Sequence, residues 1–149
     1  MYNHILIATD GSKLAAKAVE NGVELARNCG SKVTVVTVTE PFQSLGDKQH
    51  MFAGLPDDLR QQAMAYLFAA ASDALEQART AAAEAGIMCE LKSIEHARPF
   101  EAIIAAAEQG GCDLIVMASH GRSGVSGFLL GSETTKVLTH TTIPTLVCR

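Results

Sequence analysis

The fold is decided by the stretch 113–132, which reads DLIVMASHGRSGVSGFLLGS. Residues 113–118 form an apolar run, typical of a parallel strand covered on both faces. Glycines and small polar residues follow, and Gly131 and Ser132 precede a segment of helical character at 133–140. This order predicts a strand, a glycine-rich loop and a helix. Such a loop is either a slack connection or a device that brings backbone amides close to a ligand.

The rest of the chain repeats the alternation of strand and helix. Apolar and valine-rich or threonine-rich runs predict further strands, and apolar residues at helical spacing predict helices between them. The expected strands are 4–9, 32–39, 87–94, 113–118 and 144–148, and the expected helices are 13–28, 57–85, 99–109 and 133–140. We therefore expect an α/β fold, a doubly wound parallel five-stranded sheet of order 3-2-1-4-5, in one domain over residues 1–149.

Composition and charge restrict the classes of binding partner that we expect. The formal net charge is −4 and the 12 Lys and Arg residues are scattered, so neither nucleic acid nor an anionic membrane surface is expected. No apolar run approaches the roughly 18 to 20 residues of a membrane span. The N-terminus does not resemble a signal peptide, and we expect a cytoplasmic protein. The four cysteines are isolated and no histidine has ligand spacing, which favours reduced, buried thiols and no protein-built metal site.

The expected strand order places a ligand site. In open doubly wound sheets, ligands bind beyond the carboxyl ends of the strands where the strand order reverses. Here that point lies between the strand ending before Asp10 and the strand ending at Ala118, so Asp10 and the glycine loop would face each other. The loop amides could form an anion nest, and Ser132 could cap the next helix and give its hydroxyl to a phosphate. A nucleotide phosphate chain is the natural ligand.

Three familiar phosphate or hydrolase motifs do not fit. The loop spacing is G-x-x-G-x-x-G and follows the fourth strand, whereas the dinucleotide fingerprint G-x-G-x-x-G follows the first. No G-x-x-x-x-G-K-[ST] occurs, which excludes a P-loop. Ser123 and Ser126 lack the glycine spacing of the hydrolase elbow G-x-S-x-G.

The sequence resembles the universal stress protein family. Nucleotide-binding members carry G-x2-G-x9-G-[ST] after the fourth strand, and Gly121, nine residues and Gly131-Ser132 match its second part. The strand ending T-D-G-S at 9–12 and the closing I-P-T-L-V at 143–147 also match, so the resemblance covers the whole chain. It implies a Rossmann-like, adenine nucleotide alpha hydrolase-like sandwich. It also implies an adenine nucleotide as ligand, ATP or AMP/ADP, with any Mg²⁺ brought by the phosphates.

The resemblance also implies roles for residues. Asp10 and Val38 would line the adenine and ribose pocket, with Met117 nearby. Gly121, Gly131, Ser132 and the Glu133 amide would hold the phosphates, with the Glu133 carboxylate facing solvent. One position departs from the motif, because Ala118 replaces its first glycine and its methyl could crowd the ribose or α-phosphate. The full set of expected nucleotide-binding residues is Ala8, Asp10, Val38, Met117, Ala118, Gly121, Arg122, Gly131, Ser132 and Glu133.

Several of these residues have simpler interpretations. Asp10 could be the N-cap of the first helix, alone or together with a ligand contact, and Ser132 could be no more than the N-cap of the last. Arg122 could be a solvated loop cation or a phosphate partner. The long irregular segment 41–56 is typical of a lid or a flap.

The last predicted strand is relevant to the oligomeric state of the protein. Residues 143–148 are apolar and nearly uncharged, and as an edge strand they could pair with another chain. The resemblance implies a homodimer through this strand. Three functions remain open: an ATP-binding regulator of the stress response with at most slow hydrolysis, a dimeric interaction module that binds no nucleotide, and an ATPase or phosphotransferase.

Overall fold

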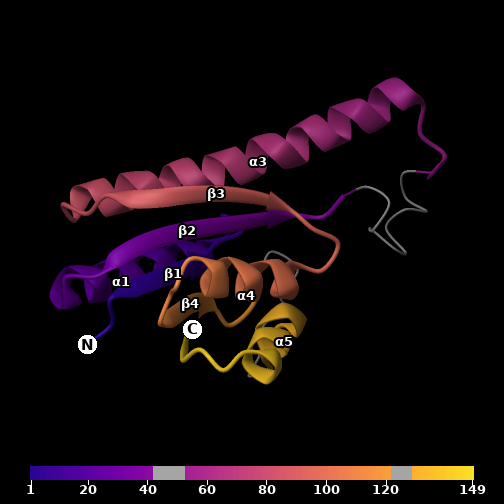
Figure 1. Ribbon diagram of the computed structural model, residues 1–149. Helices are drawn as coiled ribbons and strands as arrows, with labels where there is room; N and C mark the ends of the chain where they lie inside the picture. Colours follow the sequence, from indigo (N-terminus) through magenta and orange to yellow (C-terminus); the bar gives the residue numbers. More distant parts are fainter. Residues whose placement is uncertain (42–52, 122–128) are drawn as a thin grey trace.

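A computed structural model describes residues 1–41, 53–121 and 129–149. Figure 1 shows a layered α/β arrangement, with α1 and α3 on one face of the sheet and α4 and α5 on the other. The sheet is parallel throughout, with the order β3-β2-β1-β4-β5. Its strands are β1 His4–Ala8, β2 Lys32–Thr39, β3 Cys89–Glu95, β4 Leu114–Ala118 and β5 Thr145–Cys148. The helices are α1 Lys13–Cys29, α3 Asp57–Glu84, α4 Pro99–Gln109 and α5 Ser132–His140.

The predicted fold class and strand order are confirmed, and the bounds of β2 and α4 agree with the sequence to the residue. The largest difference is at β3, which begins at Cys89 and not at 87. The Ile87 amide still donates to the Ala82 carbonyl at 2.8 Å, as part of the turn that ends α3. Gly86 makes this turn possible with a φ of 75°. The chain therefore joins the sheet two residues later.

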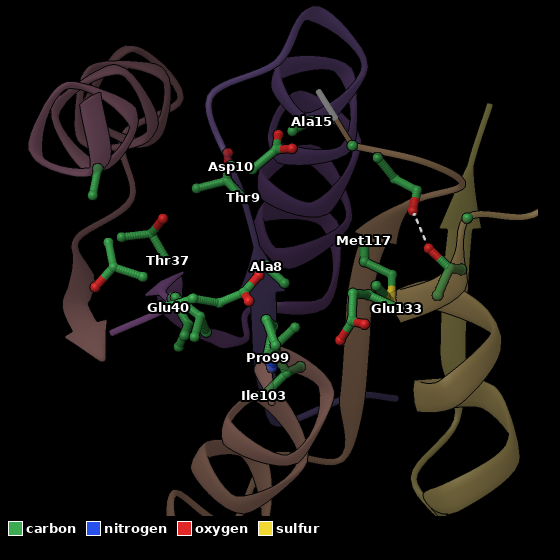
Figure 2. A pocket seen from close by; sticks show the side chains of 18 of the residues that line it. Ala8, Thr9, Asp10, Ala15, Thr37, Glu40, Pro99, Ile103, Met117 and Glu133 are labelled. Atoms are coloured by element: carbon green, nitrogen blue, oxygen red, sulfur yellow. Dashed lines mark hydrogen bonds between the residues drawn. The ribbon is translucent and has the colours of Figure 1, made fainter. Parts of the chain in front are cut away.

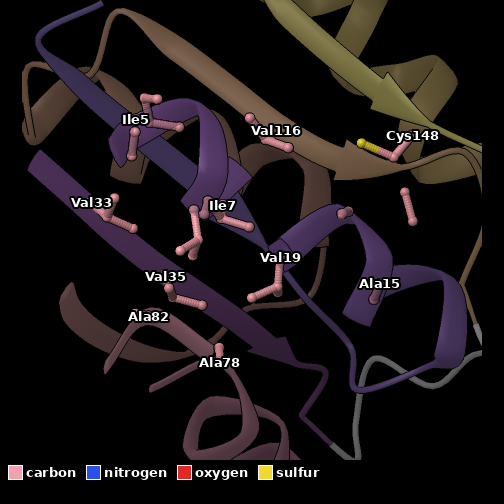
Figure 3. Close-up of a cluster of buried hydrophobic side chains, with 14 of the residues drawn as sticks. Ile5, Ile7, Ala15, Val19, Val33, Val35, Ala78, Ala82, Val116 and Cys148 are labelled. Carbon is pink, nitrogen blue, oxygen red and sulfur yellow. The ribbon is translucent and has the colours of Figure 1, made fainter. Parts of the chain in front are cut away.

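Alternation along the strands divides the core into two clusters. Ile5, Ile7, Val33 and Val35 face α1 and α3, where they meet small residues such as Ala78 (Figure 3). Their neighbours along the strands face α4 and α5, where the cluster contains Leu6, Ala8, Val36, Ile103, Ile115, Met117 and Val137. Because both faces of the sheet are covered, the central strands β1 and β4 are almost entirely apolar, and β2 combines valines with the buried threonines Thr34 and Thr37.

Helix caps near the strand ends differ from the sequence predictions. Ser12, and not Asp10, caps α1, because its side chain accepts from the Ala15 amide. Asp10 accepts from the Ser12 amide at 2.9 Å and so orders the turn before the helix. At α5 the N-cap position belongs to Gly131, whose carbonyl already accepts from Thr135, and Ser132 is the first helical residue. Both cap predictions were wrong by one or two residues.

Three further observations bear on the sequence predictions. Strand β5 lies at the edge of the sheet, as predicted, and Leu146 on it is 39% exposed. All four cysteines are free thiols, and burial raises the pKa of both Cys89 and Cys112. Within residues 1–41, 53–121 and 129–149, no helix is both long and apolar enough to cross a membrane.

Candidate functional site

A cavity of about 660 Å³ opens at the carboxyl ends of β1, β2 and β4. Figure 2 shows Thr37 and Glu40 on one side, Met117 and Glu133 on the other, and Asp10 between them. This is the point where the strand order reverses, which is where doubly wound sheets place their ligands. The predicted residues that line it are Ala8, Asp10, Val38, Met117, Ala118, Gly121, Gly131, Ser132 and Glu133. Arg122 and most of the 41–56 segment lie outside the described residues.

The two sides of the reversal point meet at Asp10 and Gly121. A Cβ atom added to Gly121 would lie 2.5 Å from Oδ2 of Asp10. Real Cβ atoms do not approach an oxygen so closely, so any side chain at Gly121 would displace the carboxylate. Glycine at this position therefore allows β1 and the loop after β4 to close on each other at the cavity.

The start of α5 is held by its own hydrogen bonds. The Gly131 amide donates to the Ser119 carbonyl at 2.7 Å, and the Thr134 hydroxyl donates to the Ala118 carbonyl at 2.9 Å. A Cβ atom at Gly131 would lie 3.1 Å from the His120 Cα. The Gly131 amide is thus already used by the protein, in contrast to the expectation that this residue holds a phosphate through its amide.

The next amides of α5 are different. The first amides of a helix have no partner inside it. Those of Ser132, Glu133 and Thr134 have no acceptor among the residues that the structure describes. They carry the positive end of the helix dipole beside the cavity, since all three residues line it. An anion could accept from them.

From the sequence we expected the Glu133 carboxylate to face solvent, but the structure shows it bound to two protein groups. It accepts from the Phe100 amide at 2.9 Å and from the Lys136 ammonium at 2.7 Å. Helix α4 begins with Pro99 and lacks a side-chain cap from its own N-cap residue, Arg98. Glu133 supplies that cap from another helix, and so ties the first turn of α5 to the first turn of α4.

The methyl group of Ala118 falls on one side of β4. Ala118 belongs to the core cluster that faces α1, together with Ala15 and Cys148. Its neighbour Met117 belongs to the opposite cluster, with Ala8. Successive side chains of a strand point to opposite faces, so the methyl lies against α1 and away from the side of Met117.

The charged lining of the cavity is acidic in the part of the chain that is described. It contains Asp10, Glu40 and Glu133, and the neutralising Lys136 pairs with the last of these from outside the cavity. No Lys or Arg among the described residues lines it, although His120 does. Over the same residues, no group of three or more His, Cys, Asp or Glu is placed to hold a metal ion.

One wall was missed by the sequence analysis. Met64, Leu67, Phe68 and Ala71 of α3 line the cavity, at the spacing i, i+3, i+4 and i+7. This spacing puts them on one face of the helix. The pattern is visible in the sequence, but the alanine-rich composition of 57–85 indicated only a helix. From α4, Pro99 and Ile103 also line the cavity.

The fold and its cavity define a doubly wound α/β protein with a candidate ligand cavity at the strand-order reversal. The chain belongs to the universal stress protein family, because the model of the Universal stress protein family matches residues 1–149. It is 29% identical over 157 residues to the universal stress protein YxiE of Bacillus subtilis, with each chain covered completely.

Solved structures agree on the fold. One is a universal stress protein in complex with cAMP, with a TM-score of 0.72, 24% identity and coverage of 99% of this chain and 97% of the other. Another is the universal stress protein of Archaeoglobus fulgidus in complex with dAMP. It has a TM-score of 0.68, 18% identity and coverage of 99% and 98%. At these identities the likeness establishes the fold alone.

Proposed function

We propose that this chain binds an adenine nucleotide in the cavity and acts in the cytoplasm as a nucleotide-dependent regulator of the stress response. One observation carries the proposal: Asp10, Gly121, Gly131 and Ser132, which match the sequence patterns of the family, line one cavity, beside α5 amides without a described acceptor. Two structurally similar family proteins are complexes with cAMP and dAMP, which supports an adenine ligand.

The cavity suggests how the ligand lies. The base packs against Ala8, Val38 and Met117, whose side chains lie on the α4 side of the sheet. The ribose lies at Asp10, and the phosphates accept from the amides of Ser132 and Glu133 at the start of α5. Gly121 and Gly131 let the chain close around them. Mg²⁺, when present, is bound mainly by phosphate oxygens and water, since the acidic lining disfavours a bare polyphosphate.

Calorimetric titration and thermal unfolding with ATP, ADP, AMP and cAMP, each with and without Mg²⁺, test this proposal. A ligand at 100 times its Kd stabilises the folded state by about 2.7 kcal/mol. We expect such a shift for at least one adenine nucleotide and none for the guanine counterpart. The absence of a shift with every adenine nucleotide would contradict the proposal.

A second candidate is a dimeric interaction module that binds no nucleotide. Two observations favour it: Ala118 replaces a motif glycine, and the edge strand β5 presents Leu146 to solvent. A homodimer through 143–148 is compatible with both candidates, because β5 is the edge strand beside β4 and none of the residues 143–148 lines the cavity. Sedimentation as a monomer in dilute solution would contradict the dimer.

Efficient phosphoryl transfer is not part of the proposal. That chemistry needs positioned cations and a group that orients the nucleophile. The described lining offers His120 and carboxylates but no Lys or Arg. We therefore expect at most slow ATP hydrolysis.

A further inference from the structure

The cavity has an apolar wall on α3 that lies apart from the proposed base and phosphate positions. We call Met64, Leu67, Phe68 and Ala71 the α3 stripe; all four line the cavity. They lie in or next to the N-terminal half of α3, which extends past the carboxyl ends of β2 and β3 (Figure 1). The described residues of 57–70 include none that is buried, and Phe68 is 46% exposed. When a ligand covers large apolar side chains beside a cavity, the burial of their surface favours binding.

Strand alternation separates this wall from the position of the base. Val36 and Val38 belong with the cluster facing α4, whereas Val33 and Val35 belong with the cluster facing α3. Thr37 and Thr39 therefore share the α3 side of β2 and line the cavity there. We call this side the α3 lobe and the side of Ala8, Val38, Met117 and Ile103 the α4 lobe. Asp10, Gly121 and the start of α5 form the polar centre.

We infer that the α3 lobe receives an apolar acyl substituent of a nucleotide whose base lies in the α4 lobe. The inference rests on the proposed function. The two lobes and the polar centre belong to one continuous cavity, whose volume of about 660 Å³ is within the range for small-molecule ligands. A single ligand that fills it needs an anion between two apolar groups. An acylated nucleotide has this arrangement.

The chemistry of the stripe favours an aliphatic chain for the second group. Met64 and Leu67 are flexible or branched aliphatic side chains, and methionine adapts to irregular apolar shapes. None of the four stripe residues carries a charge or a hydrogen-bonding group that could read the edge of a second base. On this side β2 contributes the hydroxyls of Thr37 and Thr39 to the lining.

The experiment compares two stable analogues of an acyl-AMP, acetylsulfamoyl adenosine and octanoylsulfamoyl adenosine, in which a sulfamoyl group replaces the phosphate. Calorimetry gives a Kd for each analogue, for AMP and for octanoate. Phe68→Gln removes an aromatic ring from the stripe. Tyr66→Gln is the matched control, because Tyr66 is 72% exposed, lies in the same half of α3 and does not line this cavity. Circular dichroism confirms that both variants keep the helix.

In the wild-type protein we expect the octanoyl analogue to bind about tenfold more tightly than the acetyl analogue, or better, because each buried methylene adds affinity. Phe68→Gln should reduce this ratio to about threefold or less, and Tyr66→Gln should leave it unchanged. AMP binding without any advantage for the octanoyl chain, or equal losses in both variants, would overturn the inference and leave the proposed function intact. Octanoate binding with the same dependence on Phe68, but no binding of AMP or of either analogue, would overturn the inference, and the titrations with ATP, ADP and cAMP would then decide the proposed function. Binding of none of the four compounds would overturn the inference, and only the further failure of ATP, ADP and cAMP to bind would overturn the proposed function.

Discussion

The two ends of the sheet handle their polar groups in opposite ways. At the amino end, the carboxylate of Asp113 accepts from the backbone amides of Asn3 and His4 at 2.8 and 3.0 Å. The His4 ring lies 3.0 Å from the Gly110 carbonyl and 2.8 Å from the Thr34 hydroxyl. At the carboxyl end, the first amides of α5 have no acceptor among the described residues.

This difference separates groups that stabilise the fold from groups that are available to a ligand. An amide that already donates to a protein oxygen contributes to stability, whereas an amide left open beside a cavity is a binding group. The amino end should therefore respond to mutation through stability alone. The carboxyl end should respond through affinity, except where one of its residues also closes the structure.

The largest effect should come from Gly131→Val, because Gly131 both holds the start of α5 against the end of β4 and lines the cavity beside the open amides of α5. A Cβ atom there would lie 3.1 Å from the His120 Cα and 3.2 Å from the Ser119 oxygen. Neither is the end of a flexible side chain, so the start of α5 must move away from β4. Overpacking of this kind costs about 1–3 kcal/mol. We expect a lower unfolding free energy by urea titration and a loss of nucleotide binding.

Two other glycines serve as controls for this prediction. A Cβ atom at Gly54 would meet no atom within 4 Å, so Gly54→Val should change little. At Gly121 the added atom would meet the carboxylate of Asp10, so Gly121→Ala should lower affinity more than stability. A variant Gly131→Val with full stability and full binding would show that the contact between α5 and β4 is not needed.

The second effect, at the amino end, should concern stability only. Asp113→Asn removes the charge that accepts from the Asn3 and His4 amides at the start of β1, and we expect a lower Tm without a change in nucleotide affinity. The fall should be smaller than that of Gly131→Val, because the site is partly exposed. Thermal unfolding and calorimetry measure the two quantities. A change in nucleotide affinity would contradict the expectation that the amino end of the sheet affects stability alone.

The same carboxylate gives this difference a pH dependence. Hydrogen bonds from the Asn3 and His4 amides hold the pKa of Asp113 below its ordinary value of 3.8. Because the folded-state pKa is lowered, the stabilisation is fully present above the ordinary value and is lost as the pH falls through the folded-state pKa. The gap in stability between wild type and Asp113→Asn should therefore be present at neutral pH and close in acid below 3.8.

The third effect should come from Glu133→Ala. This substitution removes the side chain that caps α4 from α5, and loss of a helix cap costs about 1 kcal/mol. Glu133→Gln should retain most of that stability, since an amide oxygen can still accept from Phe100, although the ion pair with Lys136 is lost. Equal loss in both variants would assign the effect to charge rather than to capping.

The sequence predicted the framework of the fold better than the details of the site. The apolar runs at β1 and β4 and the valine-rich and threonine-rich run at β2 reflect burial on both faces, so strands, their order and the position of the cavity could all be predicted. The caps could not be placed to the residue, because Asp10, Ser12, Gly131 and Ser132 are all suitable and the choice depends on the tertiary approach of neighbouring segments. The role of Glu133 was hidden for a similar reason: its partner Phe100 is 33 residues away.

Helix α3 shows the same limit. Its C-terminal half packs on the sheet through Ala71, Ala74, Leu75, Ala78 and Ala82, and its N-terminal half extends past the strands beside the cavity. Both halves are rich in alanine and read alike as helix. Only the packing distinguishes the half that stabilises the core from the half that carries the α3 stripe.

Among substitutions at the carboxyl end, the smallest effect on affinity should come from Ala118→Gly, which restores the family glycine. Because the Ala118 methyl packs in the cluster facing α1, its removal should change nucleotide affinity by less than about threefold. Stability should fall by about 0.5–1 kcal/mol, the usual cost of glycine within a strand. Calorimetry and urea titration on one preparation give both numbers. A large gain in affinity would mean that the Ala118 methyl reaches the ligand. Ala118 would then resemble Gly131, at which one substitution changes both the packing of the protein and the binding of the nucleotide.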